Sequence, residues 1–174
     1  MREQDAPTEP VDAPLVSASV TLPEITLKAV VLSILLAAVL AGANAYLGLF
    51  AGMTVSASIP AAVVSMAVLR LFRQSNILEN NIVQTAASSG EALAAGVIFT
   101  IPGLVLIGYW TSFDYWQTFT VSLVGGVLGV LFTIPLRRAL IIHARLRFPE
   151  GVATAEVLKV GASSDAGAGG RVRL

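Results

Sequence analysis

Residues 25–50 read ITLKAVVLSILLAAVLAGANAYLGLF, and this stretch decides the fold class of the chain. A transmembrane helix needs about 20 mainly apolar residues, and the stretch exceeds that length. The same criterion finds three further stretches along the chain. The sequence therefore predicts an all-α, polytopic integral membrane protein with about four transmembrane helices, which we place at residues 25–50, 53–71, 80–109 and 118–142.

The composition supports a membrane location. Of the 174 residues, 55% are hydrophobic and 13% are charged, and the mean hydropathy is +0.79. Ordinary soluble domains carry about 25% charged residues, so lipid is the solvent that suits this surface. The net charge is zero, which gives no electrostatic footprint for nucleic acid as a partner. Cysteine is absent, which excludes disulfides and thiolate sites.

Polar segments flank the predicted transmembrane region, which covers residues 25–160. Residues 1–24 mix Pro, acidic and hydroxyl residues without helical periodicity, which is typical of a disordered tail. Residues 161–174 are rich in Gly, Ser and Ala and indicate a flexible linker.

The orientation follows from the basic residues next to the spans. Arg70 and Arg73 lie at the end of the second span and just after it, and four more lie at or after the end of the fourth span, namely Arg137, Arg138, Arg145 and Arg147. The opposite loops contain no Lys or Arg. Because loops rich in these residues stay on the cytoplasmic side, we expect a cytoplasmic N-terminus and a multi-pass chain in the inner membrane.

Glu91 is the most informative polar residue, because it adjoins the apolar run that begins at Ala92. Carboxylates near the bilayer centre are costly, so they usually face a bundle interior or a water-filled path. A substrate or proton pathway is one interpretation, with Glu91 taking up and releasing a proton during transport. The other is a carboxylate at the cytoplasmic membrane edge that caps a helix near Arg70 or Arg73.

Uncharged polar residues precede Glu91 at helical spacing. Asn81, Gln84 or Thr85, and Ser88 recur at intervals that place them on one stripe of a helix. These amides and hydroxyls could line the same pathway. They could equally tie neighbouring helices together by hydrogen bonds.

Asn44 and Tyr46 interrupt the first apolar stretch and join the candidate pathway residues. Pro60 falls inside the second predicted span and Pro102 inside the third. Proline removes a backbone hydrogen bond, so these two helices are expected to be kinked or interrupted. Interrupted helices form substrate sites in many transporters, and simple kinks are the structural alternative.

Residues 109–116 read YWTSFDYW, which suits an aromatic belt at the membrane interface, with a ligand-stacking platform as the alternative. No metal site is predicted, because the only histidine has no second histidine or close carboxylate pair beside it. The sequence also lacks a nucleophile elbow and a phosphate loop. We therefore predict neither an enzyme nor a bound cofactor.

Three sets of motifs resemble the oligopeptide transporter family. Residues 44–49 (NAYLGL) and 52–60 (GMTVSASIP) resemble its opening spans, and residues 76–91 (NILENNIVQTAASSGE) look like its prokaryotic branch. The Gln-Thr pair recurs in the plant yellow-stripe-like relatives. Residues 148–155 (FPEGVATA) are similar to a signature that these relatives carry as Tyr-Pro-Ser-Gly-Thr-Ala-Thr-Ala.

This resemblance implies a secondary transporter that takes up small peptides, or peptide-like metal chelates, usually with a proton as the coupling ion. Family members are much longer and have a second, repeated half. We therefore expect these 174 residues to be an N-terminal fragment, a partial bundle of the larger fold that does not transport in isolation. The alternative is a small, non-transporting membrane subunit whose helices pack against a partner protein.

Overall fold

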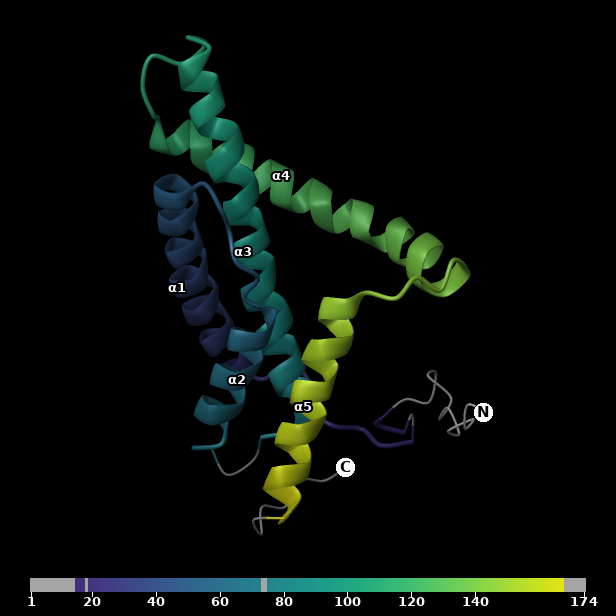
Figure 1. The fold of residues 1–174 in the computed structure, drawn as a ribbon. Helices are drawn as coiled ribbons and strands as arrows, with labels where there is room; N and C mark the ends of the chain where they lie inside the picture. Colours follow the sequence, from purple (N-terminus) through teal and green to yellow (C-terminus); the bar gives the residue numbers. More distant parts are fainter. Residues whose placement is uncertain (1–14, 18, 73–74, 168–174) are drawn as a thin grey trace, which may run out of the picture.

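The computed structural model describes residues 15–17, 19–72 and 75–167 (Figure 1). Most of the expected tail, Arg73 and the end of the expected linker therefore lie outside the described residues. The described ranges are mostly helical and contain no strand, which confirms the predicted fold class. In chain order the elements are α1 (Leu27–Ala51), α2 (Ser58–Leu69), α3 (Ile77–Leu106), α4 (Tyr115–Leu136), the π-helical η1 (Arg137–His143) and α5 (Pro149–Gly167).

Three of the helices are long and apolar enough to cross a membrane. They are α1, α3 and the continuous α4–η1 segment. They correspond to the first, third and fourth predicted spans, although α3 begins earlier than predicted, at Ile77, and Pro102 lies inside it. Asn76 sets this start, because its side chain accepts a hydrogen bond from the backbone N–H of Glu79 and so caps the helix.

The second predicted span differs from the structure. It was expected to cover residues 53–71, but α2 contains only Ser58–Leu69, because residues 53–57 are not helical. Pro60 lies in the first turn of α2, where a missing backbone N–H leaves no helical hydrogen bond unmade. The apolar stretch is therefore interrupted before Pro60, and only its second part is a helix.

Helices α1 and α3 run parallel and form the main packing contact. The salt bridge of Lys28 with Glu79 joins their starts. Farther along, a Cβ atom placed on Gly90 would lie 2.9 Å from the Cβ atom of Ala37, so the two backbones approach closely at this glycine. Close approach at small residues is how helices associate in membranes, where lipid removes the hydrophobic driving force.

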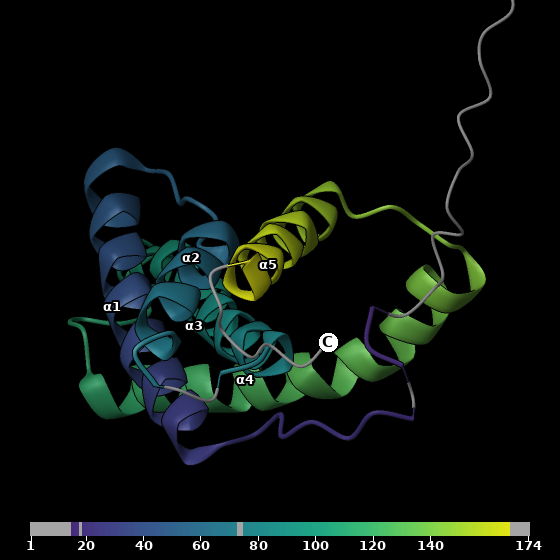
Figure 2. The same cartoon turned by 90° about the horizontal axis from the view of Figure 1, so that it is seen from below.

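Helices α2 and α5 also run parallel to each other and lie side by side (Figures 1 and 2). Gly161 of α5 contacts Met66 of α2 so closely that an added Cβ would overlap the Met66 sulfur. Helix α5 extends to Gly167, so the first part of the segment expected to be a flexible linker, which begins at residue 161, is helical. In contrast, α4 points away from the bundle and has no buried residue.

The Gly90–Ala37 contact gives a first prediction. Gly90→Leu forces α1 and α3 apart, and overpacking of this kind typically costs about 1 to 3 kcal/mol of stability. Gly96→Leu in the same helix is the matched control, because an added Cβ at Gly96 meets nothing within 4 Å. Thermal unfolding in detergent should show a lower midpoint for Gly90→Leu only, and equal midpoints would contradict the close approach.

Candidate functional site

Asn44 positions the segment that leads into α2. Its side-chain amide donates a hydrogen bond to the carbonyl of Val55 (2.8 Å), and its side-chain oxygen accepts one from the backbone N–H of Val55 (3.1 Å). Gly52 makes the reversal possible, because it ends α1 with a left-handed backbone (φ 69°) that glycine adopts without strain. The chain therefore folds back along α1 before α2 begins.

As a result, the N-terminus of α2 lies beside the middle of α3. The hydroxyl oxygens of Ser58, the first residue of α2, and Ser88 are 3.0 Å apart. The N-cap residue Ala57 provides no side-chain cap, and the backbone N–H of Ser58 donates to the Ser56 hydroxyl oxygen at 3.5 Å. The first backbone N–H groups of a helix lack partners within it and carry partial positive charge. The start of α2 therefore presents hydrogen-bond donors inside the bundle.

Helix α5 brings a carboxylate to the same place. Ser56 donates a hydrogen bond to Oε1 of Glu150, which lies in the first turn of α5. The hydroxyls of Ser56 and Ser58 hold the pKa of the Glu150 carboxyl below its usual range. We call Ser56, Ser58, Ser88 and Glu150 the serine cluster. It joins the starts of α2 and α5 to the middle of α3.

Glu91 lies one turn beyond Ser88, near the middle of α3, and is only 8% exposed. Its side chain makes no hydrogen bond or ion pair with the described residues. It lies fourteen positions after Ile77, which is roughly 21 Å along the helix. Glu91 therefore does not cap the start of α3, where Asn76 is the N-cap.

The structure places the other candidate pathway residues in different surroundings. Asn81 and Thr85 are exposed on α3, Gln84 is half-buried, and the Thr85 hydroxyl donates to the Asn81 carbonyl (2.8 Å). Tyr46 is 67% exposed and stacks on Phe50. Among the predicted residues, therefore, Ser88 belongs to the serine cluster, and Glu91 is the buried carboxylate one turn beyond it.

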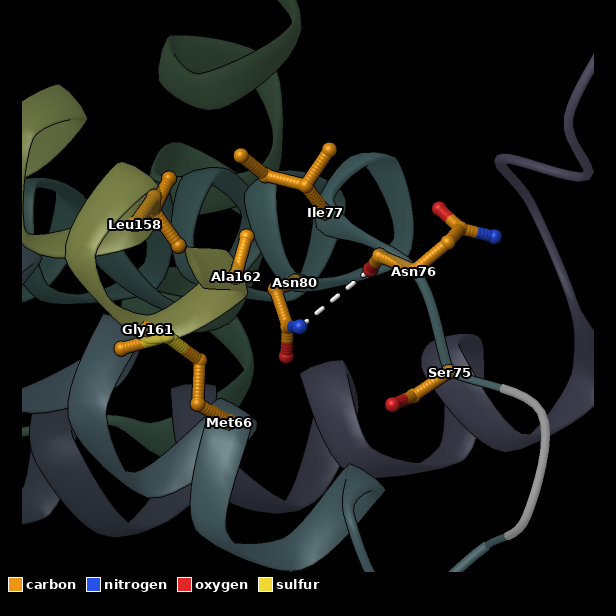
Figure 3. A pocket seen from close by; sticks show the side chains of 8 residues that line it. All are labelled: Met66, Ser75, Asn76, Ile77, Asn80, Leu158, Gly161 and Ala162. Carbon is orange, nitrogen blue, oxygen red and sulfur yellow. Dashed lines mark hydrogen bonds between the residues drawn. The ribbon is translucent and has the colours of Figure 1, made fainter. Parts of the chain in front are cut away.

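Glu91 does not line either of two cavities in the described part of the chain. One, of about 10 Å³, lies between α2, the start of α3 and α5, and Asn80 beside it donates to the Asn76 carbonyl (Figure 3). It has room for about one water molecule. The other is an open groove of about 570 Å³ at the aromatic loop, lined in part by Trp110 and Trp116. The described residues contain no group of three or more His, Cys, Asp or Glu residues that could hold a metal.

A model of the oligopeptide transporter proteins matches residues 24–174. The chain belongs to the oligopeptide transporter family. Two relatives are named as putative oligopeptide transporters. The one from Haemophilus influenzae is 57% identical over 124 residues, which cover 71% of this chain and 19% of that protein. The one from Saccharomyces cerevisiae is 28% identical over 160 residues, which cover 80% of this chain and 22% of that protein.

This family member thus spans about a fifth of the length of the relatives it matches, at 19% and 22%. No solved structure matches the chain. Family membership and the three long apolar helices together make it a multi-pass membrane protein. The relation to the yellow-stripe-like transporters and the cytoplasmic location of the N-terminus stay predictions.

Sequence reasoning missed a second buried carboxylate in this family member. Glu79 is fully buried, and its oxygens contact the Thr26 hydroxyl (2.5 Å) and the Lys28 ammonium (3.0 Å). Lys28 lies in the first turn of α1, so the pair joins the starts of α1 and α3. The available signal was a lone lysine at the edge of one apolar stretch and a lone glutamate at the edge of another.

The two hydrogen bonds between the Asn44 side chain and the Val55 backbone predict that Asn44 contributes to stability, although the sequence placed it among the pathway residues. Asn44→Ala removes both hydrogen bonds to Val55 and should lower the free energy of unfolding by roughly 2 kcal/mol. Tyr46→Ala is the control from the same helix, because the exposed Tyr46 makes no such contact and its loss should change stability little. Equal thermal midpoints for the two variants would contradict this role of Asn44.

The buried ion pair predicts a strongly non-additive result. Lys28→Met leaves the Glu79 carboxylate buried without its ammonium partner, which typically costs about 3 to 5 kcal/mol. Adding Glu79→Leu removes that unpaired charge, so the double variant should unfold at a higher temperature than Lys28→Met alone. A double variant that is less stable than Lys28→Met would show that the ion pair does not govern this contact.

Proposed function

We propose that this chain forms the N-terminal helices of a secondary transporter that takes up oligopeptides or peptide-like metal chelates together with protons. Membership of the oligopeptide transporter family and the names of both relatives support transport. We further propose that it lies in the inner membrane with its N-terminus in the cytoplasm. The arginines that follow Leu69 and Leu136 support this orientation.

The main support for the proposed proton coupling is the environment of Glu91. A carboxylate that is 8% exposed and has no partner among the described residues lies near the middle of a helix able to span the membrane. Charged groups at such positions are retained where they handle an ion or a substrate. We propose that Glu91 binds the coupling proton and releases it during the transport cycle.

The polar stripe of α3 extends this pathway. Asn81 and Thr85 are exposed and Gln84 is half-buried, so their polar groups are accessible along the face of α3. We propose that these three residues line the route of the substrate towards Ser88 and Glu91. Asn44 acts by holding the residues before α2. A non-transporting subunit is the less supported function, because both relatives are named as transporters.

The test measures uptake by the complete gene product in proteoliposomes. Glu91→Gln keeps the size of the side chain but cannot exchange a proton. We expect it to abolish peptide accumulation driven by a proton gradient, while peptide exchange without a gradient continues.

Glu156→Gln is the matched control, because Glu156 lies exposed on α5 and pairs with Lys159 at the surface. This variant should accumulate peptide like the unmodified protein. Full accumulation by Glu91→Gln would refute the role of Glu91 in coupling. Absence of peptide uptake and exchange by the unmodified protein would refute the proposed function itself.

A further inference from the structure

The serine cluster holds a carboxylate of the chain itself where a carboxylate ligand would bind. Glu150 accepts a hydrogen bond from Ser56, and the hydroxyls of Ser56 and Ser58 at the start of α2 together lower the pKa of its carboxyl. Helix N-termini attract anions because their backbone N–H groups are unpaired and their dipoles are positive there. Glu150 also lies in the first turn of α5, so two helix starts stabilise one negative charge.

Three features favour release of the Glu150 carboxylate from Ser56 and Ser58. Glu150 and Ser56 are both exposed, so neither is enclosed by the bundle. The N-cap residue Ala57 makes no side-chain hydrogen bond to the first turn of α2, so the Ser56 and Ser58 hydroxyls are the side-chain donors left for a second anion. Finally, the connection that precedes α5 is non-helical over residues 145–148, so the start of α5 has room to shift away from α2.

Glu91 indicates independently that a ligand binds beside the cluster. Ser88 contacts Ser58, and Glu91 follows Ser88 at a spacing that places both on one face of α3. Side chains in a helix tilt towards its N-terminus, so the Glu91 carboxylate projects back over the turn that holds Ser88. This buried carboxylate has no partner among the described residues and is available to a proton or to a cationic group of a ligand.

The two features match the two ends of a peptide. We propose that the N-terminus of α2, with the hydroxyls of Ser56 and Ser58, binds the C-terminal carboxylate of the transported peptide, and that Glu150 occupies this subsite until the peptide displaces it. The ammonium end of the peptide then lies towards Glu91. This inference rests on the proposed transport function and specifies how the substrate is oriented.

Competition between Glu150 and the substrate has a measurable consequence. A binding site that is free only part of the time shows an apparent affinity reduced by the fraction that is free. Removing Glu150 therefore strengthens binding of ligands that carry a carboxylate. Ligands without a carboxylate gain nothing from the vacated donors.

The experiment measures KM for one tripeptide with a free C-terminus and for its C-terminal amide, using the complete transporter in proteoliposomes. Glu150→Ala should lower KM for the free acid by roughly tenfold and leave KM for the amide unchanged. An N-acetylated tripeptide with a free C-terminus should respond like the free acid, because the effect follows the carboxylate. Equal changes for acid and amide, or no change, would overturn the subsite.

Ser58→Ala provides a second test that does not depend on Glu150→Ala folding correctly. It removes a donor of the subsite and should raise KM for the free acid relative to the amide. Ser89→Ala is the matched control, because Ser89 is exposed on α3 and its hydroxyl donates to the Thr85 carbonyl instead. An unchanged acid-to-amide ratio in Ser58→Ala refutes the subsite alone. An unmodified protein that transports neither peptide refutes the transport function on which it rests.

Discussion

The pairing of Asn44 with Val55 is the constraint on which the arrangement depends. Within a membrane, backbone N–H and C=O groups outside a helix need partners from the protein, because lipid offers none. Asn44 supplies a partner for both backbone groups of Val55 in the non-helical residues 53–57. This pairing lets the chain return along α1 without a helix and start α2 inside the bundle.

An internal helix start changes which groups meet. A continuous second span would pair the N–H groups of Ser58 and Ile59 in helical hydrogen bonds. Here the start of α2 meets two other helices instead, because the Ser58 hydroxyl contacts Ser88 in α3 and the Ser56 hydroxyl donates to Glu150 in α5. The close contact of Gly161 with Met66 keeps α5 parallel to α2, so the starts of both helices lie together. Helix ends that meet near the middle of a membrane protein are suited to bind charged groups of a substrate.

The sequence predicted the apolar helices well and the interruption poorly. Hydropathy locates α1, α3 and α4 because each is a long apolar run, and the cap at Asn76 accounts for the earlier start of α3. The same measure cannot separate residues 53–57 from α2, since Met53 and Val55 are apolar in either conformation. Their conformation depends on Asn44, which lies in another element.

The candidate site was predictable only in part for a similar reason. Glu91 is recognisable because a charge beside an apolar run is unusual in any context, and Ser88 follows from helical spacing. Glu150 is not recognisable, because its partner Ser56 lies 94 positions away in the chain. The ion pair of Lys28 with Glu79 likewise depends on the parallel packing of α1 and α3, which local patterns do not encode.

The most direct test of the central claim, an internal start of α2 that receives substrate, is the labelling of a cysteine at position 56 in membranes. The chain has no native cysteine, and any others in the complete protein would be replaced. We predict that a water-soluble maleimide labels Ser56→Cys and that peptide slows the reaction, whereas Val130→Cys on α4 stays unlabelled in lipid. A position 56 cysteine that reacts no faster than one at position 130, or that reacts equally with and without peptide, would contradict the account.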